Sequence, residues 1–431
     1  MVSQKPREIA ARILLRHAES GAFLEALVDR QLAEVRLPAV DRALVQELCY
    51  GTLRWRATLD WLIERKSVRQ RPTVPAQILL RLGLYQLFWL DRIPPHAAVN
   101  ETVEAVRTLD LGPQTGFVNA LLRTYAREID PTRAELAQLK ERDPALGWSH
   151  PRWLVNRWRS HLPQDQLQTF LAWNNAPAPT YARVNTLRAD PAQVIEAWRN
   201  ENVDYDFARF DWTPPNLVFR LRQHPPLERL KSLQDGWYYI QDPATLLSVH
   251  LLNPKPGEAV LDLCAAPGGK TTYLAQCLDN DGRIVAAEHD ARRRSRLAQN
   301  CERLGADVTT TAPEDPKAHG PFDAVLLDAP CTNSGVLRRR LDARWRLNAA
   351  ELERARRLQA QLLTTGLRRL RPGGRLAYST CSVEPEENLL LVESVLAAQP
   401  GFRLESSRLL HPARDAVDGA FVALIHRNPS P

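Results

Sequence analysis

The sequence lacks the features that would place a protein in a membrane or in an oxidising compartment. No stretch of about 18 apolar residues is uninterrupted, so no membrane-spanning helix is predicted. The first residues carry charge but no apolar run, because Arg12 and Arg16 interrupt the next apolar residues, and no secretory leader is expected. The six cysteines contain no Cys-x-x-Cys pair, so neither a metal site nor a disulfide framework is indicated. We expect reduced thiols and a cytoplasmic protein.

Lysine is also scarce, with seven residues against fifty arginines, which we attribute to codon usage. The net charge is +7, a mild excess that fits a polyanionic partner but does not require one. The hydrophobic share of 44% and the charged share of 25% are ordinary for a globular protein, which excludes a disordered or collagen-like chain. At roughly 150 residues per domain, the length predicts about three domains.

The spacing of apolar residues divides the chain into three parts. Residues 1–140 carry apolar residues at helical spacing, which predicts an all-α bundle. Residues 141–235 begin with tryptophan-bearing helices, and after Pro177 and Pro179 short strands mix with one helix, which predicts a small α+β module. Residues 236–431 alternate short apolar runs with helical stretches, which predicts an α/β domain with a doubly wound, Rossmann-like parallel sheet.

The third part has strands and helices whose positions the pattern predicts. The expected strands are 259–263, 283–288, 307–311, 324–328 and 375–378. The expected helices are 270–278, 291–304 and 349–370. In open α/β sheets ligands bind beyond the carboxyl ends of the strands, so residues that come after these strands are the candidate functional residues.

The first of these strands runs into a turn of small residues. The turn reads Cys264-Ala265-Ala266-Pro267-Gly268-Gly269-Lys270-Thr271, and it opens a helix whose N–H groups are available to a ligand. A phosphate-binding P-loop needs glycine where Cys264 stands. A Rossmann-like cofactor site needs an acid at the end of the second strand, and Glu288 occupies that position. We therefore favour the cofactor site over a P-loop or an ordinary glycine turn.

Two further strands end in a cysteine. Cys331 follows Asp328-Ala-Pro, and Cys381 follows Ser379-Thr. Both thiols are expected to face the same crevice as the glycine turn, because all three lie at carboxyl ends of parallel strands. The remaining cysteines are interpreted as packing residues: Cys49, Cys277 and Cys301 in cores, and Cys264 inside the turn.

Taken together, these motifs resemble the RNA cytosine-C5 methyltransferases, which use S-adenosylmethionine. The resemblance rests on the segments Cys264–Lys270, Asp328–Cys331, Ser379–Ser382 and Glu384–Asn388. Upstream, residues 41–42, 50–54, 93–100 and 116–123 resemble a NusB-like RNA-binding helical domain, while residues 150–154 and 183–185 resemble the linking RNA-binding module. The order of domains is similar to that of the ribosomal RNA members of the family over nearly the whole chain.

The resemblance implies a role for each candidate residue. The backbone of Cys264–Lys270 would hold S-adenosylmethionine, and Glu288 would bind its ribose hydroxyls. An acid after the third strand, Asp315 in preference to Glu314, would lie near the adenine. Asp328 would contact the cytosine ring and border the cofactor. Cys381 would attack C6 of the base, and Cys331 would assist release.

Ribosomal RNA, the 16S molecule first, is the substrate that the resemblance implies. Transfer RNA remains an alternative, and so does a non-catalytic RNA-binding or antitermination factor, although both thiols favour an enzyme. The basic residues Arg338-Arg339-Arg340, Arg344 and Arg346 come after the Cys331 strand end, and we predict that they contact RNA phosphates. Arg292-Arg293-Arg294 is interpreted as plain surface. A monomer is expected.

Two stretches depart from the usual family pattern. Thr332-Asn333-Ser334-Gly335 stands where a Ser-Gly-Thr-Gly-like turn is frequent. Asp418-Gly419-Ala420-Phe421 stands where Asp-Gly-Phe-Phe is usual. Both concern details of the substrate site rather than the class of reaction.

Overall fold

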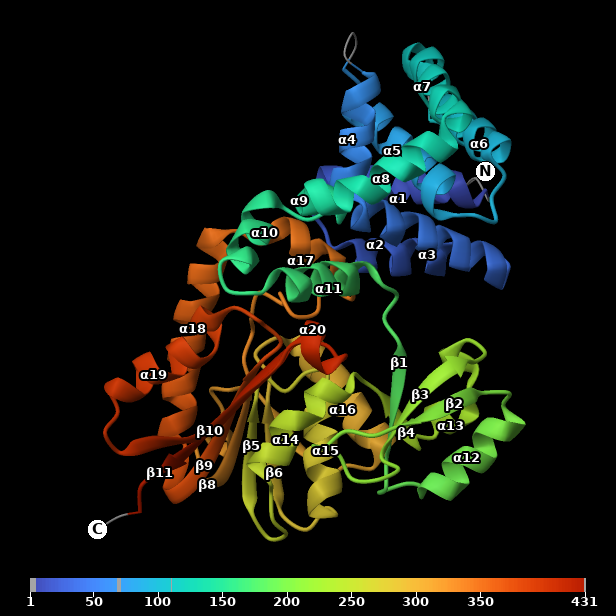
Figure 1. The fold of residues 1–431 in the computed structure, drawn as a ribbon. Helices are drawn as coiled ribbons and strands as arrows, with labels where there is room; N and C mark the ends of the chain where they lie inside the picture. The colour runs from blue at the N-terminus through green and yellow to red at the C-terminus, as the bar shows by residue number, and fades with distance from the viewer. Residues whose placement is uncertain (1–4, 68–70, 110, 430–431) are drawn as a thin grey trace. The chain divides into compact units, whose positions relative to one another are not determined.

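The computed structural model describes residues 5–67, 71–109 and 111–429 (Figure 1). The chain divides into two compact units. The helical unit comprises residues 1–176 together with 340–346, and the α/β unit comprises residues 177–339 and 347–431. The helical unit therefore continues past the boundary at residue 140 that the sequence pattern indicates, and it includes a short segment from the C-terminal half of the chain. No helix in the described residues is long and apolar enough to cross a membrane.

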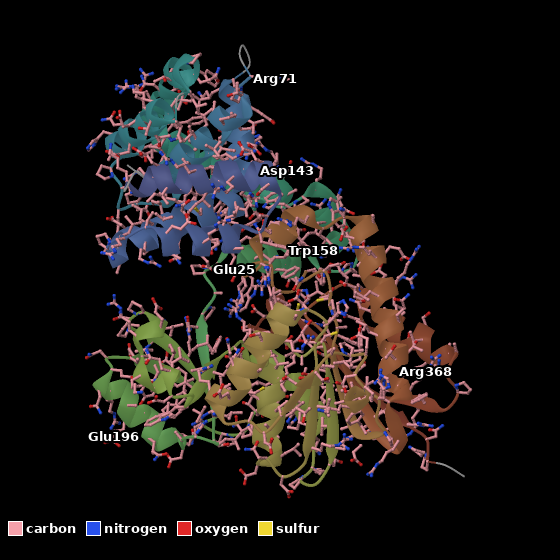
Figure 2. All side chains as sticks on the ribbon, turned by 180° about the vertical axis from the view of Figure 1, so that it is seen from behind. Glu25, Arg71, Asp143, Trp158, Glu196 and Arg368 are labelled. Carbon is pink, nitrogen blue, oxygen red and sulfur yellow. The ribbon has the colours of Figure 1, made fainter. Side chains whose placement is uncertain are left out.

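The helical unit is built as the spacing of apolar residues predicts. Its helices are α1 (Pro6–Ser20), α2 (Leu24–Glu34), α3 (Ala39–Arg54), α4 (Arg56–Lys66), α5 (Val74–Trp89), α6 (Pro95–Thr108), α7 (Thr115–Arg127), α8 (Ile129–Arg142), α9 (Pro144–Gly147), α10 (Arg152–Arg159), α11 (Gln164–Asn175) and α17 (Leu341–Arg346). Trp158, labelled in Figure 2, is completely buried and packs its ring 4.6 Å from that of Phe170. Leu341 and Trp345 of α17 join the core of this bundle.

The α/β unit begins with a small four-stranded antiparallel sheet in the order β2-β3-β1-β4. Its elements are β1 (Thr180–Val184), α12 (Pro191–Asn200), β2 (Asp204–Ala208), β3 (Val218–Gln223), α13 (Lys231–Gln234) and β4 (Tyr238–Ile240). Trp198 of α12 is fully buried against Phe219 and Tyr238 of the sheet. This is the α+β module that the sequence predicts.

A seven-stranded sheet comes next, in the order β10-β11-β9-β8-β5-β6-β7. Its elements are α14 (Leu247–Leu252), β5 (Ala259–Leu263), α15 (Gly269–Leu278), β6 (Arg283–Ala287), α16 (Ala291–Leu304), β7 (Thr309–Thr311), β8 (Phe322–Asp328), α18 (Ala349–Arg368), β9 (Leu370–Thr380), α19 (Leu389–Ala397), β10 (Phe402–Leu410), α20 (Pro412–Asp415) and β11 (Ala420–Arg427). Strands β5 to β9 are parallel, and β10 and β11 are antiparallel. The five expected strands are confirmed, and the two antiparallel strands are additions to the prediction.

The central strands are buried on both faces, which explains their nearly continuous apolar sequences. Val260 and Leu326 pack with α14 and α15 on one face. Leu261 and Leu327 point to the other face, where they pack with α18 and α19. The carboxyl ends of β5, β6, β8 and β9 consequently meet at one edge of the sheet, where the candidate residues lie.

Candidate active site

The turn after β5 has a backbone that only certain residues can adopt. Cys264 has a φ of 63° and Gly268 a φ of 106°, both in the left-handed region. A Cβ atom on Gly268 would lie 2.9 Å from Cδ1 of Leu297, so glycine is also required by close packing against α16. The turn leads into α15, whose first N–H groups receive no side-chain cap and are available to a ligand. This is a cradle for polar ligand atoms.

A buried carboxylate behind this turn fixes its two ends. Asp262 is fully buried in β5, and the hydroxyl of Thr271 in α15 donates a 2.6 Å hydrogen bond to it. Burial raises the pKa of Asp262 to about 7. The strand and the helix that flank the cradle are thereby tied together. The sequence pattern assigned no role to either residue.

Glu288 lies where the cofactor-site pattern predicts, directly after β6. It is 3% exposed, and it accepts hydrogen bonds from the backbone N–H groups of Ala266 (3.4 Å) and Asp290 (3.1 Å). The guanidinium of Arg293 lies 3.3 Å from the same carboxylate and donates to the carbonyl oxygen of Ala266 at 2.9 Å. Arg293 is a surface residue, as predicted, with a 54% exposed side chain, and it also joins the turn to Glu288.

Asp315, the third candidate acid, caps a short turn in the structure. Asp315 accepts a hydrogen bond of 2.8 Å from the N–H of Lys317 and begins the short 3-10 turn Pro316–Ala318. Glu314 is exposed and lies 3.3 Å from the ring of His289. Asp315 as the acid near the adenine stays a prediction.

Asp328, at the end of β8, is held by two side chains from neighbouring elements. The ammonium group of Lys270 forms an ion pair with it, and the hydroxyl of Ser379 donates a hydrogen bond of 2.9 Å. The Lys270 amine also lies 3.3 Å from the Ser379 hydroxyl. Lys270 thus directs its side chain to Asp328, whereas the sequence pattern placed it only in the cofactor turn.

The two cysteines at the strand ends meet. The Sγ atoms of Cys331 and Cys381 are 3.1 Å apart, and Cys381 also donates to Oδ1 of Asn333 at 3.2 Å. The hydrogen bond with Cys381, followed by burial, raises the pKa of Cys331 well above its usual value. A raised pKa favours the protonated form of Cys331. Asn333 is one of the departures from the family pattern, and its amide also donates to the Cys331 carbonyl oxygen at 2.9 Å.

The other cysteines differ from this pair. Cys49 and Cys301 are buried, as predicted, and burial raises the pKa of Cys301 to about 12. Cys264 is half-buried in the turn, where burial raises its pKa to about 12. Cys277 is exposed, so its interpretation as a core residue is wrong. It lies on the exposed face of α15, between the half-buried Gln276 and the buried Leu278.

The arginine run after Cys331 is not a set of free cations. Arg338 is 4% exposed, its Nε lies 2.7 Å from Asp418, and Arg339 contacts Asp418 as well as Asp242, the latter at 3.0 Å. Burial, followed by repulsion from Asp418, raises the pKa of Asp242 to about 6. The prediction that Arg338 contacts phosphate is wrong, because its guanidinium is enclosed with two carboxylates.

The rest of the run belongs to the helical unit. Arg344 is completely buried, and it donates to the carbonyl oxygens of Arg54 (3.0 Å), Ser149 (3.1 Å) and Asn174 (2.7 Å) and to Oδ1 of Asn175 (2.8 Å). The phosphate prediction is wrong here too. Arg346 donates to the carbonyl oxygens of Gly21 and Ala22, and Arg340 pairs with Glu25, which is labelled in Figure 2.

Arg183, in the linking module, also proves to be buried. It donates to the carbonyl oxygen of Gly269 at 2.7 Å and to Thr272 at 3.1 Å, both in α15. Its guanidinium lies between the rings of Tyr239 and Tyr273, 5.7 and 5.1 Å from their centroids. The linking module therefore supports the cofactor turn from behind, a role that the motif alone did not indicate.

Comparison with known proteins agrees with this architecture. Residues 249–426 match the family model described as 16S rRNA methyltransferase RsmB/F, residues 4–127 match the NusB family, and residues 150–210 match the RsmF/B-like ferredoxin-like domain. Ribosomal RNA small subunit methyltransferase B of Cronobacter sakazakii is 35% identical, over 93% of this chain and 92% of that protein. The protein of the same name from Vibrio vulnificus is 33% identical, over 96% of both.

The chain belongs to the ribosomal RNA small subunit methyltransferase B family. It is an S-adenosylmethionine-dependent RNA cytosine-C5 methyltransferase, as its motifs predict, with a NusB-type helical domain and a ferredoxin-like domain. The crystal structure of PH0851 has a TM-score of 0.79 and 26% identity, and it covers 99% of this chain and 100% of that one. The interpretation as a non-catalytic antitermination factor is thereby set aside.

Proposed function

We propose that this methyltransferase modifies C5 of a cytosine in 16S ribosomal RNA through a covalent bond between Cys381 and C6 of the base. The observation that carries the proposal is the pair of thiols 3.1 Å apart at the ends of two adjacent strands. Asp328, held by Lys270 and Ser379, lies at the same edge of the sheet. The small-subunit substrate is named by the relatives, and transfer RNA is the competing substrate for the same chemistry.

The residues around the turn fit S-adenosylmethionine. The left-handed backbone at Cys264 and Gly268 opens the cradle, and the packing of Gly268 on Leu297 leaves no room for a side chain there. Glu288 supplies a carboxylate beside the cradle, which suits two ribose hydroxyls. Asp315 would serve the adenine. When bound, the cofactor supplies an electrophilic methyl group on a sulfonium.

The two thiols have different roles, which we infer from their protonation. Cytosine C5 is a poor nucleophile until a thiolate adds to C6, which makes the ring enamine-like. The hydrogen bond with Cys381, followed by burial, raises the pKa of Cys331 and favours its protonated form, so we assign the attack on C6 to Cys381. Asp328, steadied by Lys270, would hold the polar edge of the ring, and the target base must leave any stack to reach it.

Release reverses the roles of the two thiols. Once its sulfur is bonded to carbon, Cys381 no longer holds the proton on Cys331. Cys331 can then give up that proton to solvent and, as a thiolate, take the C5 proton of the methylated ring. The electrons of the C5–H bond restore the ring double bond, and the C6–S bond breaks with its electron pair returning to Cys381. Atoms and charge then balance, with solvent as the acceptor of the one proton that the overall reaction releases.

A denaturing gel tests this assignment. With S-adenosylmethionine and labelled 16S RNA fragments, Cys331→Ala should methylate and then remain covalently attached, giving a retarded band. Cys381→Ala should give neither methylation nor a retarded band. The reverse pattern would exchange the two roles, and full activity of Cys381→Ala would exclude thiol chemistry. Bisulfite sequencing of RNA from a deletion strain would show whether the lost mark lies in 16S or transfer RNA.

We also propose that the protein works as a monomer in the cytoplasm. Its pair of thiols requires a reducing compartment, since their 3.1 Å separation would favour oxidation elsewhere. Light scattering on the purified protein should give the 48.8 kDa mass of one chain. A mass of twice that value would replace the monomer with a dimer.

A further inference from the structure

A buried carboxylate lies behind the two thiols, and the proposed mechanism does not use it. Glu387 closes the 3-10 turn Pro385–Glu387 after β9, and it is completely inaccessible to solvent. Four donors point at its two oxygens. The backbone N–H of Thr332 and Nε2 of Gln359 each donate to Oε1 at 2.9 Å, and the hydroxyls of Thr332 and Ser382 donate to Oε2.

The partners of Glu387 are the residues next to the thiols. Thr332 follows Cys331, and Ser382 follows Cys381. Gln359 of α18 reinforces the arrangement, since its amide also donates to the carbonyl oxygen of Pro330 at 2.9 Å, immediately before Cys331. A single carboxylate is therefore bonded directly to one neighbour of each thiol, and it links the two strand-end segments.

The pattern of donors favours the ionised form of Glu387. An amide N–H and a glutamine NH2 can only donate at Oε1, so that oxygen must accept. The two hydroxyls at Oε2 bring the number of hydrogen bonds to four. These bonds offset the free-energy cost of burying the negative charge. Burial raises the pKa of Glu387, while these hydrogen bonds lower it. The negative charge also contributes to the raised pKa of Cys331.

We propose that Glu387 is a positioning residue for the methyl transfer: it fixes the separation of Cys331 and Cys381 through Thr332 and Ser382, and its negative charge keeps Cys331 protonated until Cys381 has bonded to the base. The inference rests on the proposed roles of the thiols. A simple space-filling role would not require a carboxylate at this place, because an apolar side chain would avoid the cost of a buried charge.

Two substitutions separate geometry from charge. In Glu387→Gln the amide oxygen can take the Oε1 place, and the NH2 can donate to the hydroxyl oxygens of Thr332 and Ser382, which rotate to accept. The network keeps its shape and loses its charge. In Glu387→Ala both are lost. Glu393, exposed on α19, gives matched controls in Glu393→Gln and Glu393→Ala.

Single-turnover methylation with saturating S-adenosylmethionine gives the first readout. Glu387→Ala should slow methyl transfer about 100-fold while cofactor affinity, measured by calorimetry, stays within about twofold, because the cradle uses other residues. Glu387→Gln should recover to within about tenfold of the unmodified enzyme. Both Glu393 variants should match the unmodified enzyme. Methyl transfer within about threefold in Glu387→Ala, or an equal loss of cofactor affinity, would overturn the proposal.

The pH dependence of product release gives the second readout. Release requires Cys331 to lose its proton, and removing a nearby negative charge makes that loss easier. The rising limb of release should therefore move to lower pH in Glu387→Gln. If the rising limb of the release profile does not move, the negative charge of Glu387 plays no part in its role. If Cys331→Ala alone fails to trap RNA, the thiol assignment is wrong, whereas Glu387 is still judged by the rate of methyl transfer.

Discussion

The turn Cys264–Lys270 and the run Arg338–Arg346 both carry a clear sequence signal, but only the first could be interpreted from it. The turn works through its own backbone: a left-handed Cys264, a left-handed Gly268 and a helix start are local properties of the sequence. The arginines work through partners that lie far away in sequence, such as Asp418 and the carbonyl oxygen of Arg54. The charge of a residue does not reveal whether its side chain is solvated or enclosed.

The contacts of these arginines also change which residues count as part of the helical domain. Because Arg344 and Trp345 are built into the helical unit, the segment after Cys331 is covalently attached to that unit at α17. A chain lacking residues 1–140 would leave α17 without its partners in that segment, such as the carbonyl oxygen of Arg54 that Arg344 contacts. The separate helical pattern of residues 1–140 also predicts a domain that folds on its own and aids RNA binding but not the chemistry, and this stays a prediction.

The largest effect is expected at Arg344. Arg344→Met leaves four acceptors without their donor, at roughly 1–3 kcal/mol each, so the helical unit should lose about 6 kcal/mol. Hydrogen exchange of the amides in α3 and α11 measures this opening in the full chain. Arg30→Ala, a 71% exposed ion pair on α2, is the matched control and should change little. Unchanged protection in Arg344→Met would mean that this arginine does not stabilise the interior of the helical unit.

A smaller loss of stability is expected when Arg338 is replaced. Arg338→Met removes one cation from a buried group of two arginines with Asp242 and Asp418, which costs about 3–5 kcal/mol. The pKa of Asp242, which Arg338 helps to lower, then rises further. A raised pKa in the folded state gives stability at low pH that is lost as pH rises, so the destabilisation should be greater at pH 8 than at pH 5.

Chemical denaturation of the α/β unit at the two pH values measures this difference. The double variant Arg338→Met with Asp418→Asn should recover part of the loss at pH 8, since one unpaired charge is gone. A loss that is equal at both pH values would mean that the two carboxylates do not carry the effect.

These two arginines mark the limit of prediction from sequence. The parallel strands β5 to β9 were predictable because their apolar runs alternate with helices, and the site could be placed because ligand residues gather at one edge of such a sheet. Glu288, Cys331 and Cys381 lie there as expected. The side-chain contacts of Lys270, Arg293 and Glu387 could not be predicted, since they depend on which neighbour each side chain reaches. The strands β10 and β11 were missed because they lie after the last recognised strand–helix alternation.

A smaller effect than those at Arg344 and Arg338 is expected at Glu288, and it tests the turn Cys264–Lys270, whose role depends on local residues. Glu288→Ala should weaken S-adenosylmethionine binding at least about tenfold, because two hydrogen bonds to a charged acceptor are worth about 1.5–3 kcal/mol or more. Calorimetry measures the affinity directly. Glu302→Ala, an exposed acid on α16, serves as the control. Unchanged affinity in Glu288→Ala would remove this carboxylate from the cofactor site.

The smallest effect is expected at Arg340, and it is the sharpest test of what remains of the phosphate prediction. Its side chain is 58% exposed and pairs with Glu25, itself 59% exposed, so Arg340→Ala should cost less than about 1 kcal/mol of stability. An arginine that binds a phosphate contributes about 0.9 to the slope of log affinity against log salt concentration. We expect the slope for 16S RNA fragments to change by less than about 0.5 in Arg340→Ala, since Glu25 already compensates this charge. A change near 0.9 would mean that RNA displaces Glu25, and the arginine run would then divide into an enclosed part that builds the fold and one exposed residue that meets the substrate.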